Sequence, residues 1–138
     1  MEGRIIGPRL PNPKSLEKGE ESYIPQTVEI FWDNIEEPGH LMLTGGGTFI
    51  AHATEPYYPL ARYSNGDLAA VSVDVGLGQA VLSMPYVTYP ACATTLFIKH
   101  FKQRYPSINT FKMQKEIVNS EKFRVKCCLR LFKAICKV

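Results

Sequence analysis

The sequence lacks a long uninterrupted apolar run, a secretory signal pattern and an internal repeat. Its longest apolar stretch, Leu68 to Met84, is broken by Ser72, Asp74 and Gln79. A membrane-spanning helix needs about 20 predominantly apolar residues, so no transmembrane segment is predicted. The opening residues, "MEGRIIGPRLPNPK", have no apolar core of the kind that a secretory signal carries. We therefore expect a soluble cytoplasmic protein.

The sequence also lacks the spacings that hold metals or form disulfide frameworks. No C-x-x-C pair occurs among the cysteines, which are Cys92, Cys127, Cys128 and Cys136. This spacing favours free, reduced thiols. The histidines His40, His52 and His100 are scattered, and only His52 has a carboxylate nearby, at Glu55. No metal site is predicted, because one such pair does not supply the ligands that a metal needs.

Catalytic patterns are equally scarce. His52 can be interpreted as a base, but a lone histidine at a strand end is more typical of a surface or packing residue. Cys92, in "YPACATT", begins a predicted helix whose dipole lowers thiol pKa values, yet its small neighbours favour a packed thiol. Without an adjacent base or a pair of carboxylates, we assign no catalytic residue. A hydrolase or amidotransferase would instead require thiol-dependent turnover that is lost in Cys92→Ala.

What the sequence does contain is a glycine string, in "HLMLTGGGTF". A phosphate-binding P-loop places Lys and Ser/Thr directly after its last glycine, and here Gly47 is followed by Thr-Phe-Ile-Ala. A dinucleotide fingerprint opens a helix, whereas the residues after Gly47 have strand character. The string therefore favours a turn or a close backbone approach. A pocket role stays open, since ligands gather at the carboxyl ends of strands in open α/β sheets.

Charge is divided unequally along the chain. The segment up to Ile98 holds five basic and eleven acidic residues, and the segment from Lys99 onward holds eleven basic and two acidic ones. A basic segment attracts anionic partners, although a solvated helix surface has the same composition. The residues expected to contact an anionic partner are Lys122, Arg124, Lys126, Arg130, Lys133 and Lys137.

Hydrophobic periodicity predicts strands followed by helices. Val28, Ile30 and Trp32 alternate with Thr27, Glu29 and Phe31, which is typical of a strand with one buried face. Asn65-Gly66 predicts a tight hairpin turn. Further strands are expected at 41–43, 49–51, 57–63, 68–75 and 79–84, with the valines of 68–75 on the buried face. Helices are expected over 91–104, from a cap at Asn109, and as a basic amphipathic helix from Cys128.

Three segments in order, "LTGGGTF", "YYPLARY" and "AAVSVDVGLGQAVLS", resemble the later half of a known domain. This is the glutamine-amidotransferase-like domain at the N-terminus of eukaryotic biotin–protein ligases. The resemblance covers about residues 3–83 and includes "RIIGPRL" near the start. It implies an α/β fold, a partial class I amidotransferase-like (flavodoxin-like) sheet with a β-hairpin, followed by C-terminal helices. It also implies that the chain starts inside a parallel sheet and is a fragment, with 1–105 the partial domain and 106–138 a basic helical tail.

The departures from that family limit the activity that the resemblance implies. The chain has no G-x-C-x-G elbow, and "MPYVTYP" follows "VLS" without the family's His and Glu. The biotin and ATP of the family belong to a ligase core that has no counterpart here. We expect a non-catalytic accessory module that contacts that core or a biotin-accepting carboxylase domain. The resemblance makes Gly45, Gly46, Gly47 and Phe49 lining residues of a former pocket.

A second hypothesis is a small interaction protein that binds an anionic partner through its basic C-terminal helix. Binding of that kind weakens steeply as ionic strength rises, and it should vanish on truncation before Glu121. A shape-matched contact with a ligase core should persist in salt. Ionic strength therefore separates the two hypotheses.

Overall fold

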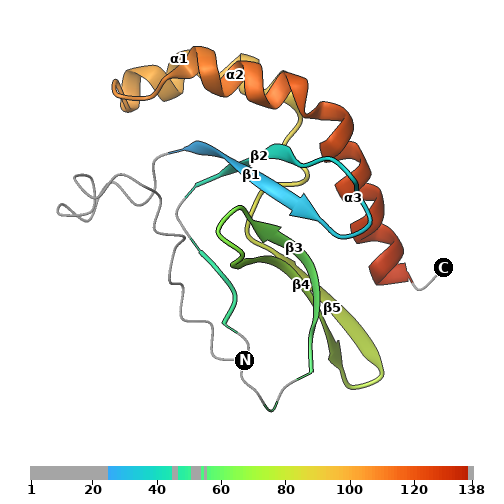
Figure 1. Cartoon of the computed structure of the whole chain (residues 1–138). Helices are drawn as coiled ribbons and strands as arrows, with labels where there is room; N and C mark the ends of the chain where they lie inside the picture. Colours follow the sequence, from blue (N-terminus) through green and yellow to red (C-terminus); the bar gives the residue numbers. More distant parts are fainter. Residues whose placement is uncertain (1–24, 45–46, 51–53, 55, 137–138) are drawn as a thin grey trace.

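The structure, a computed structural model, describes residues 25–44, 47–50, 54 and 56–136. It contains a five-stranded sheet in the order β2-β1-β3-β4-β5 and three helices. The sheet curls into a half-barrel, and the helices form an arc along one side of it (Figure 1). The strands are β1 (Gln26–Trp32), β2 (Gly39–Leu43), β3 (Tyr58–Tyr63), β4 (Leu68–Val75) and β5 (Gly78–Ser83), and the helices are α1 (Ala91–Arg104), α2 (Thr110–Asn119) and α3 (Glu121–Cys136).

Every pair of neighbouring strands in the described sheet is antiparallel. The mixed α/β composition was expected, but the flavodoxin-like arrangement is not confirmed, and the parallel pairing implied by the resemblance is not found among these strands. The physical reason lies in the connections, since β1–β2, β3–β4 and β4–β5 are joined by short turns. A short turn can join only antiparallel neighbours, whereas parallel neighbours need a crossover of a dozen or more residues.

Three turns set the register of the sheet, and the sequence analysis predicted the one at Asn65-Gly66. Asn34 adopts a positive φ of 60° in the turn between β1 and β2. Gly66 and Gly76, with φ of 89° and 58°, reverse the chain before β4 and after it. Gly66 follows Asn65, as the hairpin signal predicted, and glycine adopts such angles without a steric penalty.

The main core lies on one face of the sheet and continues into α3. The predicted face of β1 is confirmed, because Val28, Ile30 and Trp32 are all buried. They form one cluster with residues of β2, β3 and β4 and with Phe123 and Cys127 of α3. A segment after β5 also meets β2, where the N–H of Tyr86 donates to the carbonyl of Met42 at 2.8 Å. This contact draws the two ends of the sheet toward each other.

The prediction for β4 was wrong in one respect. Its valines were expected to form a buried face, but Val71 is buried while Val75 is 60% exposed. Conversely, Ala70 and Ser72, assigned to the opposite face, are both buried. The first half of β4, an interior strand paired with β3 and β5, is buried on both faces, whereas the alternating pattern predicted burial of one face only. Its far end extends beyond the core as an exposed hairpin.

Helices α1 and α2 lie where the sequence placed them, and the third helix is longer than predicted. Helix α1 covers the predicted range, and the side chain of Asn109 accepts a hydrogen bond from the N–H of Lys112 at 3.0 Å, as the predicted cap of α2. A second apolar cluster joins α2 to β2 through Met42, Met113 and Ile117. Helix α3 begins seven residues before the predicted start at Cys128.

The boundary at residue 105 between a sheet domain and a helical tail stays a prediction. Both helices beyond that position pack on the sheet, α2 against β1 and β2, and α3 against β2 and β5. At one contact, Gly39 of β2 faces the ring of Phe123 so closely that a Cβ on Gly39 would overlap Cγ and Cδ1 of the ring. Helix α3 is therefore fixed against the sheet at its first turn.

Candidate functional site

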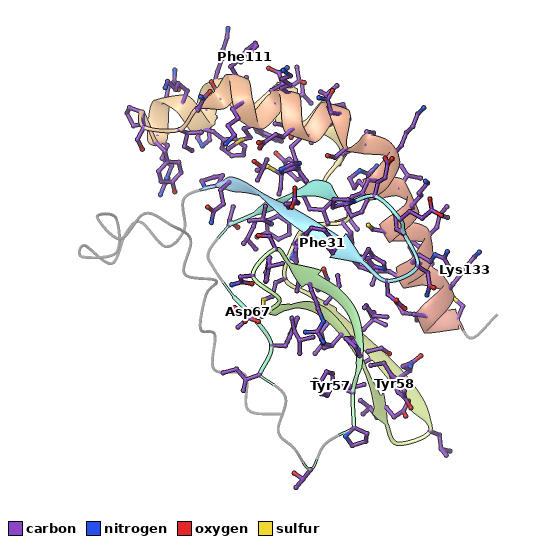
Figure 2. All side chains as sticks on the ribbon, in the orientation of Figure 1. Phe31, Tyr57, Tyr58, Asp67, Phe111 and Lys133 are labelled. Atoms are coloured by element: carbon purple, nitrogen blue, oxygen red, sulfur yellow. The ribbon has the colours of Figure 1, made fainter. Side chains whose placement is uncertain are left out.

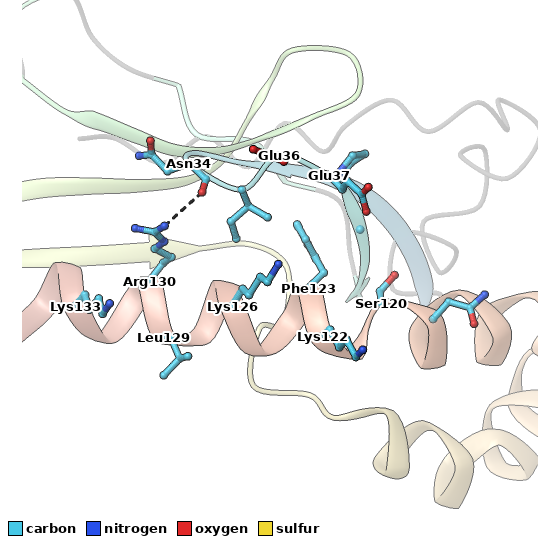
Figure 3. Close-up of a pocket in the computed structure, with 14 residues that line it drawn as sticks. Asn34, Glu36, Glu37, Ser120, Lys122, Phe123, Lys126, Leu129, Arg130 and Lys133 are labelled. Carbon is cyan, nitrogen blue, oxygen red and sulfur yellow. Dashed lines mark hydrogen bonds between the residues drawn. The ribbon is translucent and has the colours of Figure 1, made fainter.

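A groove between α3 and the turn that joins β1 to β2 is the candidate functional site (Figure 3). It has a volume of about 810 Å³. Figure 3 shows Phe123, Lys126 and Arg130 pointing from α3 toward the turn, while Leu129 points away from it. The residues that line the groove are Asn34, Ile35, Glu36, Glu37, Pro38 and Gly39 on one side, and Asn119, Ser120, Lys122, Phe123, Lys126, Leu129, Arg130 and Lys133 on the other.

The two walls of the groove are held together at both ends. At one end, the main-chain N–H of His40 donates to the hydroxyl of Ser120 at 2.8 Å, next to the contact between Gly39 and Phe123. At the other end, the guanidinium of Arg130 donates to the main-chain oxygen of Asn34 at 3.3 Å. The groove therefore lies between two fixed contacts of α3, one with β2 at the start of the helix and one with the β1–β2 turn.

Basic side chains line the helical wall at helical spacing. Lys122, Lys126, Arg130 and Lys133 recur at i, i+4, i+8 and i+11, which places them in one stripe along α3. We call these four residues the basic stripe. Among the residues that the structure describes, Lys122, Lys126 and Lys133 form no ion pair. Glu36 and Glu37 on the opposite wall are exposed and balance only part of this charge.

Arg124 has a different role from the basic stripe. Its guanidinium donates to both carboxylate oxygens of Glu121, at 2.9 and 2.7 Å, and to the main-chain oxygen of Val87 at 2.9 Å. The side chain is 14% exposed. Hydrogen bonding to Arg124 lowers the pKa of Glu121. That carboxylate also accepts from the N–H of Ala91, so Arg124 and Glu121 tie α3 to the start of α1.

The remaining predicted partner contact, Lys137, lies outside the described residues. The same is true of Gly45, Gly46, His52 and Glu55. The assignment of Lys122, Arg124, Lys126, Arg130 and Lys133 to an anionic partner stays a prediction. The structure adds that four of these five line one groove and that Arg124 has its own internal partners.

The described part of the glycine string is tied into the sheet. Gly47 is buried, and its carbonyl accepts a hydrogen bond from the hydroxyl of Tyr63 at 2.7 Å. Phe49 pairs with Leu68 through an isolated bridge, in which its N–H donates to the Leu68 carbonyl at 3.2 Å. Burial of Tyr63 raises the pKa of its hydroxyl, which therefore stays protonated as a donor. The pocket-lining assignment of Gly47 and Phe49 stays a prediction.

One polar cluster was missed by the sequence. Glu116 of α2 accepts a hydrogen bond from Thr27 of β1 and lies 3.9 Å from Nε2 of His40 and 3.8 Å from Nζ of Lys112. Only the Lys112–Glu116 pair has a sequence signal, its i,i+4 spacing. His40 and Glu116 are 76 positions apart in the chain, so spacing gives no indication of their contact. This cluster fastens α2 to the β1–β2 hairpin.

The cysteines differ in exposure, from buried Cys127 to exposed Cys92. Burial raises the pKa of Cys127 to about 12, which keeps it protonated and unreactive at neutral pH. Cys92 and Cys136 are exposed free cysteines. Within the described ranges, no three His, Cys, Asp or Glu side chains are grouped as a metal site would require.

The comparisons with known proteins give no relative. No family model, curated protein or solved structure matches this chain. None of the helices in the described part of the chain is long and apolar enough to cross a bilayer. The function must therefore be argued from the groove and its charges.

Proposed function

We propose that this chain is a non-catalytic interaction module that binds an anionic protein through the groove between α3 and the β1–β2 turn. The basic stripe carries this proposal. None of its four side chains forms an ion pair among the described residues, and all four line the same groove. Clustered charge of one sign in a concave surface attracts an oppositely charged partner and speeds its association.

The test compares two double substitutions that change the net charge equally. Lys126→Glu with Lys133→Glu reverses two charges in the groove, and Lys99→Glu with Lys115→Glu reverses two exposed charges on α1 and α2. Fluorescent poly-L-glutamate is the probe, and its binding is measured by anisotropy at about 50 and 200 mM salt. We expect the groove variant to lose at least tenfold in affinity and the control variant to lose much less. Equal losses would show that net charge alone attracts the probe and would overturn the proposal.

A second candidate function is the accessory module of a biotin–protein ligase. Two of the segments that carry the resemblance, "YYPLARY" and "AAVSVDVGLGQAVLS", provide the three consecutive strands β3, β4 and β5. The described part of "LTGGGTF" contacts them through Gly47–Tyr63 and Phe49–Leu68. This neighbourhood supports one structural unit, and we propose that it corresponds to the later part of an amidotransferase-like (flavodoxin-like) domain. Biotin and ATP would then be bound by the ligase core.

The second candidate is tested with a purified ligase core and a biotin-accepting carboxylase domain as probes. Saturable binding that persists at about 500 mM salt would support it, because a shape-matched contact is less screened than a charged one. Absence of binding to both probes would exclude it. Both functions are proposed for the cytoplasm, where thiols without a disulfide framework stay reduced.

A further inference from the structure

Helix α3 carries a second exposed stripe directly beside the basic one. Val125, Leu129 and Phe132 recur at i, i+4 and i+7, and their side chains are 43%, 57% and 60% exposed. Val125 and Leu129 follow Lys122 and Lys126 by three positions, so the two stripes run side by side along the helix. We call Val125, Leu129 and Phe132 the apolar stripe. Phe123 and Cys127, on the opposite side of α3, are buried against the sheet.

We propose that the partner's binding element is an acidic amphipathic helix that lies along α3. This inference rests on the proposed function and specifies the partner. The apolar face of such a helix covers the apolar stripe, and its carboxylates reach across to the basic stripe at the edge of the groove. From Lys122 to Lys133 the basic stripe extends about 16 Å at 1.5 Å per residue, which matches three turns of a partner helix.

The opposite charges on the two walls of the groove favour this occupant over an anionic membrane and over a second copy of the chain. An anionic membrane would meet the basic stripe, but it would also approach the exposed carboxylates of Glu36 and Glu37 on the opposite wall of the groove. A second copy of the chain would bring another basic stripe into the same interface, at the cost of repulsion between like charges. An acidic helix avoids both conflicts, because a basic residue at its far edge can pair with Glu36 or Glu37.

The test uses a fluorescein-labelled peptide of about 18 residues with leucines on one helical face and glutamates on the others. A control peptide has the same composition with the leucines scrambled around the helix. We expect the amphipathic peptide to bind at least tenfold more tightly than the scrambled one. Leu129→Ser with Phe132→Ser should remove this preference, because the leucines of the peptide then lose the two apolar side chains that they contact on α3. Phe111→Ser is the matched control, since Phe111 is 79% exposed on the outer side of α2, away from the groove (Figure 2).

Each outcome supports or overturns the inference. Equal binding of both peptides, sensitive to Lys126→Glu with Lys133→Glu, would leave the proposed function standing and overturn the helical partner. Binding of neither peptide would overturn the proposed function as well. Tighter binding to phosphatidylserine vesicles than to the amphipathic peptide would favour a membrane as the partner. A dimer in sedimentation equilibrium that is dissociated by Leu129→Ser would favour a second copy of the chain. Either result would overturn the inference.

Discussion

Replacing Gly39 by alanine should loosen the contact that fixes α3 to the sheet. A Cβ at this position would overlap Cγ and Cδ1 of Phe123 and lie 2.8 Å from its Cβ. Phe123 is 8% exposed and belongs to the main core, so its ring has no free space to enter. Overpacking of this kind costs about 1 to 3 kcal/mol, and alanine recovers about 0.5 to 1 kcal/mol of backbone entropy relative to glycine. We expect a net loss of about 1 kcal/mol, and at most about 2.5 kcal/mol, which corresponds to a decrease of about 4 to 10 °C in Tm.

A double-mutant cycle tests the reasoning behind that loss. Phe123→Ala removes the ring, so Gly39→Ala should cost almost nothing when it is added to Phe123→Ala. The measurement is a thermal melt followed by near-UV circular dichroism, in which Trp32, 4% exposed, reports fixed packing. Gly66→Ala is the control, because Gly66 has a φ of 89° and nothing within 4 Å of an added Cβ. Its cost comes from backbone strain and should be the same with or without the ring. Equal costs of Gly39→Ala in both backgrounds would refute the reasoning.

Three further predictions follow from the helices. Asn109→Ala should destabilise the chain by about 1 kcal/mol in thermal melts, because α2 loses its capping oxygen, and Asn109→Asp should not. Glu121→Gln should cost less than about 1 kcal/mol at pH 7, since the carboxylate is more than one third exposed. Its pKa is lowered in the folded state, so the difference from wild type in urea titrations should be present above about pH 4.3 and disappear as the pH falls. Iodoacetamide at pH 8 should label exposed Cys92 in the native chain, and it should label buried Cys127 only in urea. Mass spectrometry of the digested chain measures the labelling. Equal labelling of Cys127 with and without urea would contradict its burial.

Local signals predicted the hairpins and helices well, because each depends on a few neighbouring residues. Asn65-Gly66 specifies a turn by its tolerance of positive φ, and Asn109 specifies a helix start by its side-chain oxygen. The alternation in β1 identified its buried face because that strand keeps one face in the core from Val28 to Trp32. These features can be predicted without knowing which residues from distant parts of the sequence pack against them.

Features that depend on distant contacts could not be predicted in the same way. Ser72 is buried although it lies on the small and polar face of β4, and the contact between His40 and Glu116 follows from the packing of α2 on the hairpin. For α3, the sequence predicted an amphipathic helix that begins only at Cys128. The structure instead buries Phe123 and Cys127, because Gly39 leaves room for the Phe123 ring against the sheet. The groove depends on this contact between Gly39 and Phe123, because the contact holds α3 beside the β1–β2 turn.

The two faces of α3 determine how its binding role can be tested. Truncation before Glu121 would remove the proposed contacts, but it would also take Phe123 and Cys127 out of the main core. Loss of a buried aromatic side chain alone costs about 3 to 5 kcal/mol, against a total stability of about 5 to 15 kcal/mol for a domain. A truncated chain that fails to bind would therefore report unfolding as readily as a lost surface. Substitutions confined to exposed positions, such as Lys133 and Phe132, change the surface while the buried face keeps the helix in place.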